Sequence, residues 1–362
     1  VADQLKPGKK YGYELYIDSK KINRPYPLEF QSQKLWQWRT EPPDFKVAFG
    51  SCFYVNEPEV DRPGTPFGGS LEIMTSLYNK HPDVMLWIGD NVYLREADWN
   101  TRTGIFHRYT HTRSAAEIQP LLASVHNYAI LDDHDFGPND SDRSYRGKND
   151  SFAAFKKFWG NPTFGTKENP GGYTKFEWAD VEFFLVDNRY YRTPNKRKTG
   201  DRTMLGEPQV QWLIDSLVSS QATFKVVVIG GQVVNPATGT HIEDYSQYPE
   251  EKDKILGAIE KENIKGVLFL TGDRHQTELS KLERKDTYPL YDFTVSPLTA
   301  KPYDSSKSEN NYLRVPDTLV VEYNFGMIEV TGPRKERKLN FTIYNKDGKS
   351  LWTKEIKVSE LK

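Results

Sequence analysis

Four apolar segments of this chain end where residues of metal-binding type begin. They are residues 45–49, 84–88, 127–131 and 266–271, and the residues that follow them are Cys52, Asp90, Asp132 to Asp135, and Asp273 with His275. Short apolar runs bounded by turn residues are typical of buried strands. Carboxylates and an imidazole delivered from several strand ends are what a metal site at one rim of a sheet requires. The sequence therefore predicts that four strands bring these residues to one place.

Composition narrows the classes of protein that fit. The chain has 362 residues with 49 basic and 50 acidic side chains, a net charge of -1. This balance gives no global field that would favour nucleic acid or an anionic membrane. No run of about 18 apolar residues is present to span a bilayer. Because the chain starts with valine and shows no signal sequence, we expect it to be processed from a longer one.

Residues 1–42 differ in pattern from the rest and form a predicted N-terminal β segment. Residues 10–17 alternate like a half-exposed strand, and residues 28–39 indicate another. The residues before Tyr11 resemble the tyrosine corner of fibronectin-type sandwiches. Two or three strands are too few for an independent sandwich. The segment is therefore either the tail of a sandwich domain or a set of strands that pack on the main body.

Residues 43–362 are predicted to form a single catalytic domain in which strands alternate with helices. Predicted helices are residues 71–80, parts of 100–123, 151–159, 207–219 and 249–262. Further predicted strands are residues 175–176 with 181–186, 225–229, 292–295, 319–323, 327–330, 339–344 and 351–358. Parallel βα units with inserted and appended meanders predict two stacked sheets with helices outside, an α/β fold with four αββα layers.

The candidate ligands differ in chemical hardness. Asp90 and Asp273 are hard oxygen donors, His275 and Asn139 are intermediate, and Cys52 is soft once ionised. Tyr93 follows Asp90 by three residues, so its ring can return to the same cavity. A phenol titrates near about 10 and a thiol near about 8.5, so binding both as anions requires a strong Lewis acid. Ferric iron fits this requirement better than magnesium or calcium.

A second site formed by Asp273, Asn139 and a shared Asp90 would offer mostly oxygen ligands, which suit calcium, magnesium or manganese. Two bridged metals ionise a water and clamp the apical oxygens of a phosphoryl displacement. The residues therefore indicate phosphoester hydrolysis by a metal-bound hydroxide. Two alternatives stay open: hydrolysis of another oxyanion ester such as a sulfate ester, and a catalytically silent metal-binding or glycan-binding surface protein.

Seven phrases, in this order, resemble the PhoD alkaline phosphatase/phosphodiesterase family of the metallophosphoesterase superfamily. They are residues 49–52 (Phe-Gly-Ser-Cys), 89–93 (Gly-Asp-Asn-Val-Tyr), 131–135 with Asn139-Asp140, 186–192, Leu205-Gly206 with Gln209 and Trp212-Leu213, 230–232 (Gly-Gly-Gln) and 271–275 (Thr-Gly-Asp-Arg-His).

The resemblance implies a metallophosphoesterase-like core with a ferric ion held by Cys52, Asp90, Tyr93 and His275. It implies calcium beside it, with Asp90, Asn139 and Asp273 as ligands; Mg²⁺, Mn²⁺ and Zn²⁺ are the alternatives for this second metal. It further implies a small or polymeric phosphomonoester or phosphodiester substrate, no sequence-specific nucleic acid partner, and export to the periplasm, the cell surface or the medium.

Two departures from the family pattern affect the predicted substrate and metal contacts. Residue 92 is valine where some members carry a phosphate-contacting arginine, so Asn91, Arg95 or Arg274 is predicted to anchor the substrate. The loop 136–140 contains one proline, so Asn139 and Asp140 can exchange the ligand role.

Other residues carry less specific predictions. Asp133 and His134 are predicted catalytic residues, with metal binding and ligand orientation as alternatives and His134 as the candidate general acid. Asp187 and Arg189 are predicted to form a structural ion pair. The basic loop 192–202 is either solvated or placed at the rim of the site. Trp36 and Trp38 are predicted to pack in a strand rather than to form a sugar platform. The remaining histidines are predicted to be structural or surface groups: His81, His107, His111, His126 and His241.

Overall fold

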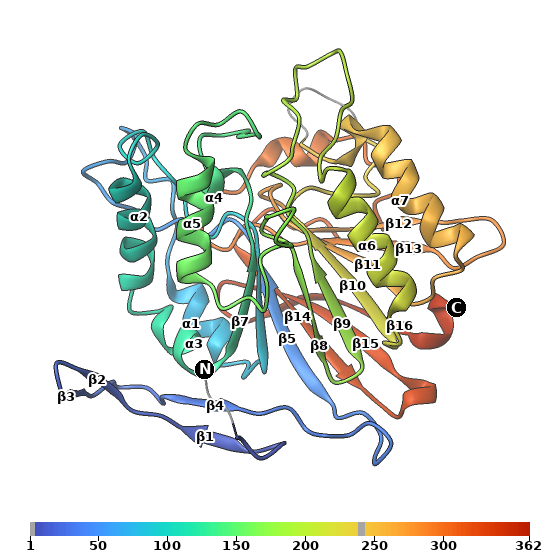
Figure 1. The fold of residues 1–362 in the computed structure, drawn as a ribbon, viewed down its shortest axis with the longest axis horizontal. Helices are drawn as coiled ribbons and strands as arrows, with labels where there is room; N and C mark the ends of the chain where they lie inside the picture. The colour runs from blue at the N-terminus through green and yellow to red at the C-terminus, as the bar shows by residue number, and fades with distance from the viewer. Residues whose placement is uncertain (1–3, 238–242) are drawn as a thin grey trace.

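Two six-stranded sheets stack face to face in the computed structural model, which describes residues 4–237 and 243–362 (Figure 1). One sheet has the order β16 (Ser350–Lys357), β15 (Lys338–Asn345), β14 (Asn324–Thr331), β5 (Phe45–Gly50), β6 (Val84–Ile88) and β7 (His126–Ile130). The other has the order β12 (Glu278–Leu282), β13 (Leu290–Thr294), β11 (Val267–Thr271), β10 (Phe224–Ile229), β9 (Val181–Leu185) and β8 (Thr174–Trp178).

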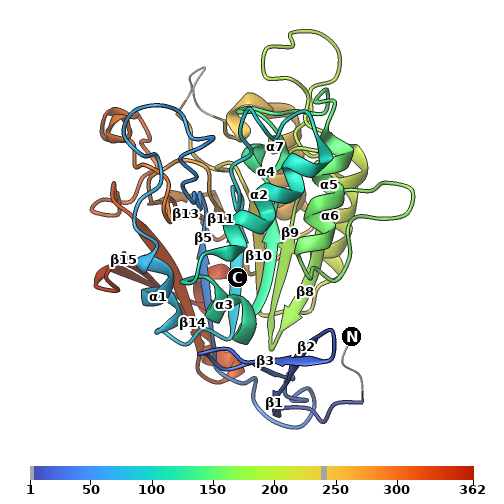
Figure 2. The same ribbon diagram turned by 90° about the vertical axis from the view of Figure 1, so that its left-hand side faces the viewer.

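Helices cover the outer faces of both sheets (Figures 1 and 2). On the side of β5–β7 lie α1 (Glu72–Tyr78), α2 (Arg102–Ser114), α3 (Gln119–Ser124) and α5 (Lys148–Phe158). On the side of β9–β11 lie α6 (Glu207–Ser219) and α7 (Pro249–Lys261). A further short helix, α4 (Asp133–Phe136), follows β7 directly. The predicted αββα sandwich is confirmed.

Strand alternation explains why the central strands can be buried on both faces. In β6, Val84, Leu86 and Ile88 belong to the core between the sheets, whereas Met85 and Trp87 pack with the helices outside. Successive side chains of a strand point to opposite faces, so an apolar run of this length fills two layers at once. The two sheets meet directly at Phe293 and Phe341, whose rings stack 3.7 Å apart between centroids.

The parallel strands place the chain's polar turns at one rim. Neighbours β5, β6 and β7 are parallel in one sheet, as are β9, β10, β11 and β13 in the other. The rim is crowded, because a Cβ on Gly272 would lie 2.5 Å from the carbonyl oxygen of Ile88. Glycine after β11 therefore permits the strand ends of the two sheets to approach each other.

The N-terminal segment forms two small hairpin-like pairs, β1 (Lys10–Gly12) with β4 (Glu29–Gln31) and β2 (Leu15–Ile17) with β3 (Lys20–Ile22). It lies across the end of the sandwich opposite α4 and contacts the main body (Figure 1). The Tyr13 hydroxyl donates to the Ala123 carbonyl at 2.9 Å, and the Gln33 amide donates to the Glu177 carbonyl at 2.8 Å. The Tyr11 hydroxyl accepts a 2.8 Å hydrogen bond from the Lys6 backbone, as in a tyrosine corner.

Several predicted elements differ from the structure. The predicted strand 28–39 is reduced to β4, because the backbone turns back at Trp36, whose carbonyl accepts from Arg39 and Thr40. Trp38, on this turn, is 96% exposed, so its predicted strand packing is wrong. Residues 319–323 form only a single bridge, between Val320 and Thr277. Strand β12 and helix α4 had no sequence prediction.

Replacing Phe341 with alanine is expected to destabilise the fold by about 3–5 kcal/mol, because it leaves a cavity where the two sheets touch. Trp38→Ala is the control and is expected to change stability by less than about 0.5 kcal/mol, since the side chain is exposed. Denaturant unfolding followed by far-UV circular dichroism measures both. Equal losses in the two variants would contradict the assignment of the inter-sheet core.

Candidate metal centre

The predicted ligands lie at strand ends in an unusual backbone conformation. Cys52, Asp90, Asp273 and His275 have φ values of 59°, 51°, 68° and 52°, all in the left-handed region. Non-glycine residues rarely adopt this region, and each instance costs about 1–3 kcal/mol. The left-handed turns end the strands sharply at this rim. Such strain is typical of positions where function fixes the geometry.

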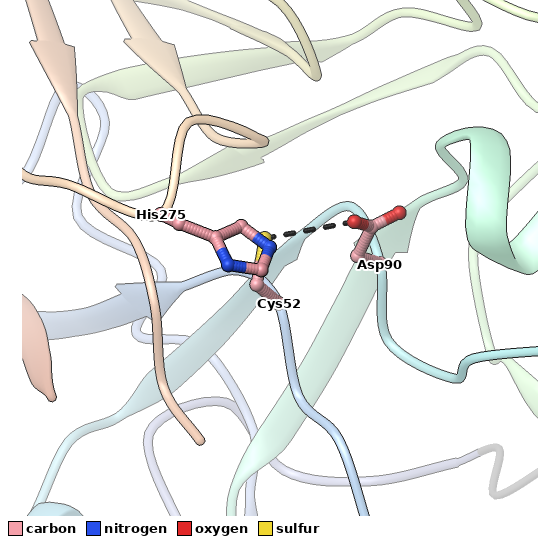
Figure 3. A group of neighbouring side chains, drawn as sticks. All are labelled: Cys52, Asp90 and His275. Atoms are coloured by element: carbon pink, nitrogen blue, oxygen red, sulfur yellow. Dashed lines mark hydrogen bonds between the residues drawn. The ribbon is translucent and has the colours of Figure 1, made fainter. Parts of the chain in front are cut away.

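The first group of donors combines a thiol, a carboxylate and an imidazole. One ligand atom from each of Cys52, Asp90 and His275 lies within 4.8 Å of the others, and the three side chains converge from separate strand ends (Figure 3). The Cys52 thiol donates to an Asp90 oxygen at 3.6 Å. The Tyr93 hydroxyl lies 3.1 Å from Nε2 of His275. The structure thus brings together the four residues predicted to hold iron.

Two contacts outside the donor group fix the orientation of the His275 ring. Its Nδ1 lies 2.6 Å from the Lys301 carbonyl oxygen, and its ring stacks on Tyr303 at 4.4 Å between centroids. A donor bond from Nδ1 leaves Nε2 as the lone-pair nitrogen that faces the group. Burial lowers the pKa of His275 to about 4, so the imidazole is neutral and available as a ligand.

A second set of carboxylates adjoins the first and centres on Asp133. This residue takes part in three groups of closely spaced donors: with Asp90 and His134, with Asp132 and Asp273, and with Asp140 and Glu243. Asp90 belongs to both the thiol group and one of these. The two sets of donors are therefore continuous, as a dinuclear centre requires.

Asn139 and Asp140 lie side by side in the loop after α4. The Asn139 amide is exposed and donates to a carboxylate oxygen of Asp140 at 2.8 Å. The Asp140 backbone donates to Asp133 at 2.7 Å, which holds this loop against the site. The carboxylate of Asp140 lies among the closely spaced donors, and both residues line the same cavity.

Glu243 is the member of the site that sequence reasoning missed. It follows none of the buried strands whose ends mark the other donors, and no motif singled it out. Only the folded structure reveals its role, because its carboxylate pairs with two buried arginines, Arg189 at 2.8 Å and Arg192 at 3.0 Å.

The buried donors favour a bound cation electrostatically. Burial, reinforced by neighbouring carboxylates, holds the pKa values of Cys52, Asp90, Tyr93 and Asp273 well above their ordinary ranges. One carboxylate oxygen of Asp133 is buried without a hydrogen-bond partner. Unpaired buried carboxylates are costly unless a counter-ion compensates them. The mixed thiol, phenol, imidazole and carboxylate set fits one softer and one harder cation.

Arg189 neutralises part of this negative charge. Its wholly buried guanidinium contacts Asp132 at 2.5 Å and Glu243 at 2.8 Å, and lies 3.8 Å from Asp133. Burial raises the pKa of Asp133, but His134 and Arg189 outweigh that effect and hold it below its usual value. The predicted Asp187–Arg189 ion pair is wrong. The Asp187 carboxylate instead accepts backbone N–H groups, among them that of Arg189 at 2.9 Å.

A cavity of about 360 Å³ opens above these donors, and its lining includes His134, Asn139, Asp273 and Arg274. The His134 ring stacks on Tyr93 with centroids 4.3 Å apart. Of the three predicted substrate contacts, Arg274 alone lines this cavity.

Asn91 and Arg95 are committed elsewhere. The Asn91 amide donates to the Ile130 carbonyl at 2.7 Å, and its backbone donates to Asp135. Arg95 is buried with its Nε bonded to the Tyr54 hydroxyl at 2.8 Å. Both side chains stabilise the turns beneath the site instead of facing the cavity.

The remaining histidines that the structure describes take no part in the donor groups. His107 contacts Glu57, and His126 bonds the Gln31 carbonyl. His241 lies outside the described residues. In the basic loop 192–202, Arg192 is buried against Glu243, whereas Lys196, Arg197 and Lys198 are exposed.

Comparison with known proteins agrees with this geometry. The PhoD-like phosphatase family matches residues 48–341, which include every donor described above. This chain belongs to the PhoD-like phosphatase family. This match confirms the resemblance that the sequence motifs predict. Members of the family are metal-dependent phosphoesterases.

Individual relatives are distant in sequence and close in fold. Alkaline phosphatase D of Bacillus subtilis (strain 168) is 24% identical over 206 residues, a match that covers 49% of this chain and only 35% of that relative. A solved structure of PhoD superposes with a TM-score of 0.77 at 17% identity, covering 99% of this chain and 79% of the other. Purple acid phosphatase PPD1 from yellow lupin (Lupinus luteus) seeds gives a TM-score of 0.67 at 13% identity, with 98% and 60% coverage.

A third similar structure is GAP50, the anchor in the inner membrane complex of Plasmodium, with a TM-score of 0.53 at 12% identity, covering 88% of this chain and 89% of the other. Across residues 4–237 and 243–362, no helix combines the length and apolar character needed to cross a membrane.

Arg189→Met is expected to destabilise the protein by about 3–5 kcal/mol, since it leaves Asp132 buried without its cationic partner and Glu243 paired with Arg192 alone. The same substitution at Arg62, whose pair with Glu96 is solvent-exposed, is expected to cost less than about 1 kcal/mol. Thermal and denaturant unfolding of both variants tests this. Similar stability of the two would show that Arg189 does not neutralise the site.

Proposed function

We propose that this chain hydrolyses phosphomonoesters, phosphodiesters or both at a dinuclear centre of Fe³⁺ and Ca²⁺. The observation that carries the proposal is that Asp90 belongs both to the group with Cys52 and His275 and to the group with Asp133 and His134. Asp90 also lines the cavity above these donors. Membership of a family of metal-dependent phosphoesterases supports the reaction class. The donor chemistry supports the choice of metals.

Iron would be held by Cys52, Asp90, Tyr93 and His275, because a thiolate and a phenolate suit ferric iron. Calcium would be held by Asp90, Asp273 and Asn139 or Asp140, with Asp133 as a further oxygen donor. The closeness of the Asp140 carboxylate to donor atoms of Asp133 and Glu243 supports Asp140 as the donor from this loop. Elemental analysis of the purified protein distinguishes calcium from magnesium, manganese and zinc.

The two cations, when bound, would supply the Lewis acidity that ionises a water and neutralises charge on the phosphoryl group. The chain's own residues would position the ester and manage its proton. Arg274 lines the cavity and would contact non-reacting phosphoryl oxygens.

His134 is the residue that we propose donates a proton to the leaving oxygen. Its ring lines the cavity, and its Nε2 lies 3.9 Å from an Asp133 oxygen. Burial lowers the pKa of His134, and the Asp133 carboxylate opposes that effect by favouring the protonated ring. Asp133 would therefore offset part of this lowering and favour the protonated form of His134.

Two other functions compete with this one. Hydrolysis of a sulfate ester would use the same donors, and the similarity to GAP50 shows that the fold also occurs in a protein described as an anchor. Assays with p-nitrophenyl phosphate, bis-p-nitrophenyl phosphate and p-nitrophenyl sulfate separate these alternatives. Absence of phosphoester turnover in metal-loaded protein would reject the proposal.

We also propose that the protein is exported, to the periplasm, the cell surface or the medium, because the family that it resembles is typically exported. Fractionation of cells that produce the full-length protein tests this. Recovery of the protein in the cytoplasm alone would reject export.

Cys52→Ala is expected to lower phosphoesterase activity by at least about 100-fold and to remove most of the bound iron, because it deletes a direct ligand. The side chain is small and fully buried, so the fold should remain. Iron content, activity and circular dichroism of the same preparation provide the measurement. Full activity in this variant would exclude Cys52 as a ligand.

Concentrated wild-type protein is expected to show a visible charge-transfer band from phenolate and thiolate bonding to ferric iron. Tyr93→Phe should shift or abolish the phenolate part of this band. Tyr109→Phe is the matched control, because Tyr109 is equally buried but lies on α2 away from the donors. A band that is identical in all three proteins would remove Tyr93 from the iron ligands.

A further inference from the structure

The cavity above the donors is strongly acidic. Its described lining includes six carboxylates: Asp90, Asp133, Asp140, Glu243, Asp273 and Glu309. Among the lining residues that the structure describes, Arg274 alone carries a fixed positive charge. Arg274 is therefore the side-chain cation that would contact an anion beside the proposed metals.

Arg274 is not free to act as a full cation. Its Nη2 donates to an oxygen of Glu309, and both side chains are largely buried, at 10% and 9% exposure. Its Nε has no hydrogen-bond partner within residues 4–237 and 243–362. An ion pair in such a sheltered place interacts strongly, because little water screens it. Glu309 thus offsets the charge that Arg274 would otherwise present to a substrate.

Glu309 is held in this position from its other side. Its second oxygen accepts from the Asn235 amide at 2.7 Å, and the same amide donates to the Gln232 side chain at 2.8 Å. Gln232 in turn bonds Glu278 and Thr294 on β12 and β13, each at 2.7 Å. The carboxylate is therefore the end of a buried polar network and differs from a mobile surface group.

We propose that Glu309 is a specificity-determining residue that biases the site toward phosphodiesters and against phosphomonoesters. This inference rests on the proposed function. A monoester carries about two negative charges at alkaline pH, whereas a diester carries one. Neutralising Arg274 removes attraction from both, and the additional negative charge of the monoester suffers more. Glu309 acts through Arg274 and is a positioning residue.

Glu309→Gln tests the proposal, because the amide keeps the shape of the side chain and removes its charge. The ratio of kcat/KM for p-nitrophenyl phosphate to that for bis-p-nitrophenyl phosphate is expected to rise by about 10-fold, with most of the change in KM. Inorganic phosphate should become a tighter inhibitor by a similar factor. Glu309→Asp, which keeps the charge, should stay near the wild-type ratio.

Glu336→Gln is the matched control, because Glu336 is an exposed residue of η3 (Arg334–Glu336) outside the cavity lining. It should leave the ratio and phosphate inhibition unchanged. Arg274→Met provides an independent measurement: it leaves Glu309 uncompensated and should lower the ratio, and combining it with Glu309→Gln should restore part of the loss.

The outcomes separate this inference from the proposed function. If wild-type protein loaded with metals hydrolyses neither ester, the proposed function fails. If it hydrolyses them but Glu309→Gln leaves both the substrate ratio and phosphate inhibition unchanged, the role of Glu309 is overturned and the function stands. Should Glu309→Gln fold poorly, Arg274→Met decides: a wild-type ratio in this variant would show that Glu309 cannot act through Arg274 and would overturn the inference.

Discussion

Repulsion among buried carboxylates is the constraint on which the rest of the rim depends. Arg189 reduces this repulsion by forming buried ion pairs with Asp132 and Glu243. The groups it does not reach, Asp90 and Asp273 among them, keep raised pKa values because burial disfavours their charged forms. A cation that binds only the folded arrangement would offset this cost, so ion binding and folding are coupled at this site. The choice of donor residues therefore affects the stability of the folded protein as well as the chemistry of the site.

The sandwich can sustain such a rim because its interior is firmly packed. Alternation in β6 sends three side chains to the core between the sheets and two to the helices, so a one-residue slip would disrupt the packing of both layers. A fixed register also fixes where each strand ends. The left-handed conformations of Cys52, Asp90, Asp273 and His275 are thus maintained by strands that have no alternative placement.

The fold class and the donors at strand ends were predictable, whereas residues that depend on distant partners were not. Cys52, Asp90, Tyr93 and His275 follow buried strands, and the structure brings them together as the strand pattern predicts. Glu243 has no local signal, because its role depends on Arg189 and Arg192. Asn91 and Arg95 are predicted to anchor substrate in place of a family arginine at residue 92, but the turn after β6 directs them to Ile130 and Tyr54. Proximity along the chain does not determine direction. Trp38 shows the same limit, because local alternation suggested a strand where the backbone turns.

The donors come from both sheets, and this division has a mechanical consequence. Cys52 and Asp90 follow strands of one sheet, whereas Asp273 and His275 follow a strand of the other. An ion bound by donors from both groups would link the two sheets directly. Deep inside, the rings of Phe293 and Phe341 perform the same task without charge. With an ion bound, the two sheets would be joined at two separated points, one of which a chelator would release.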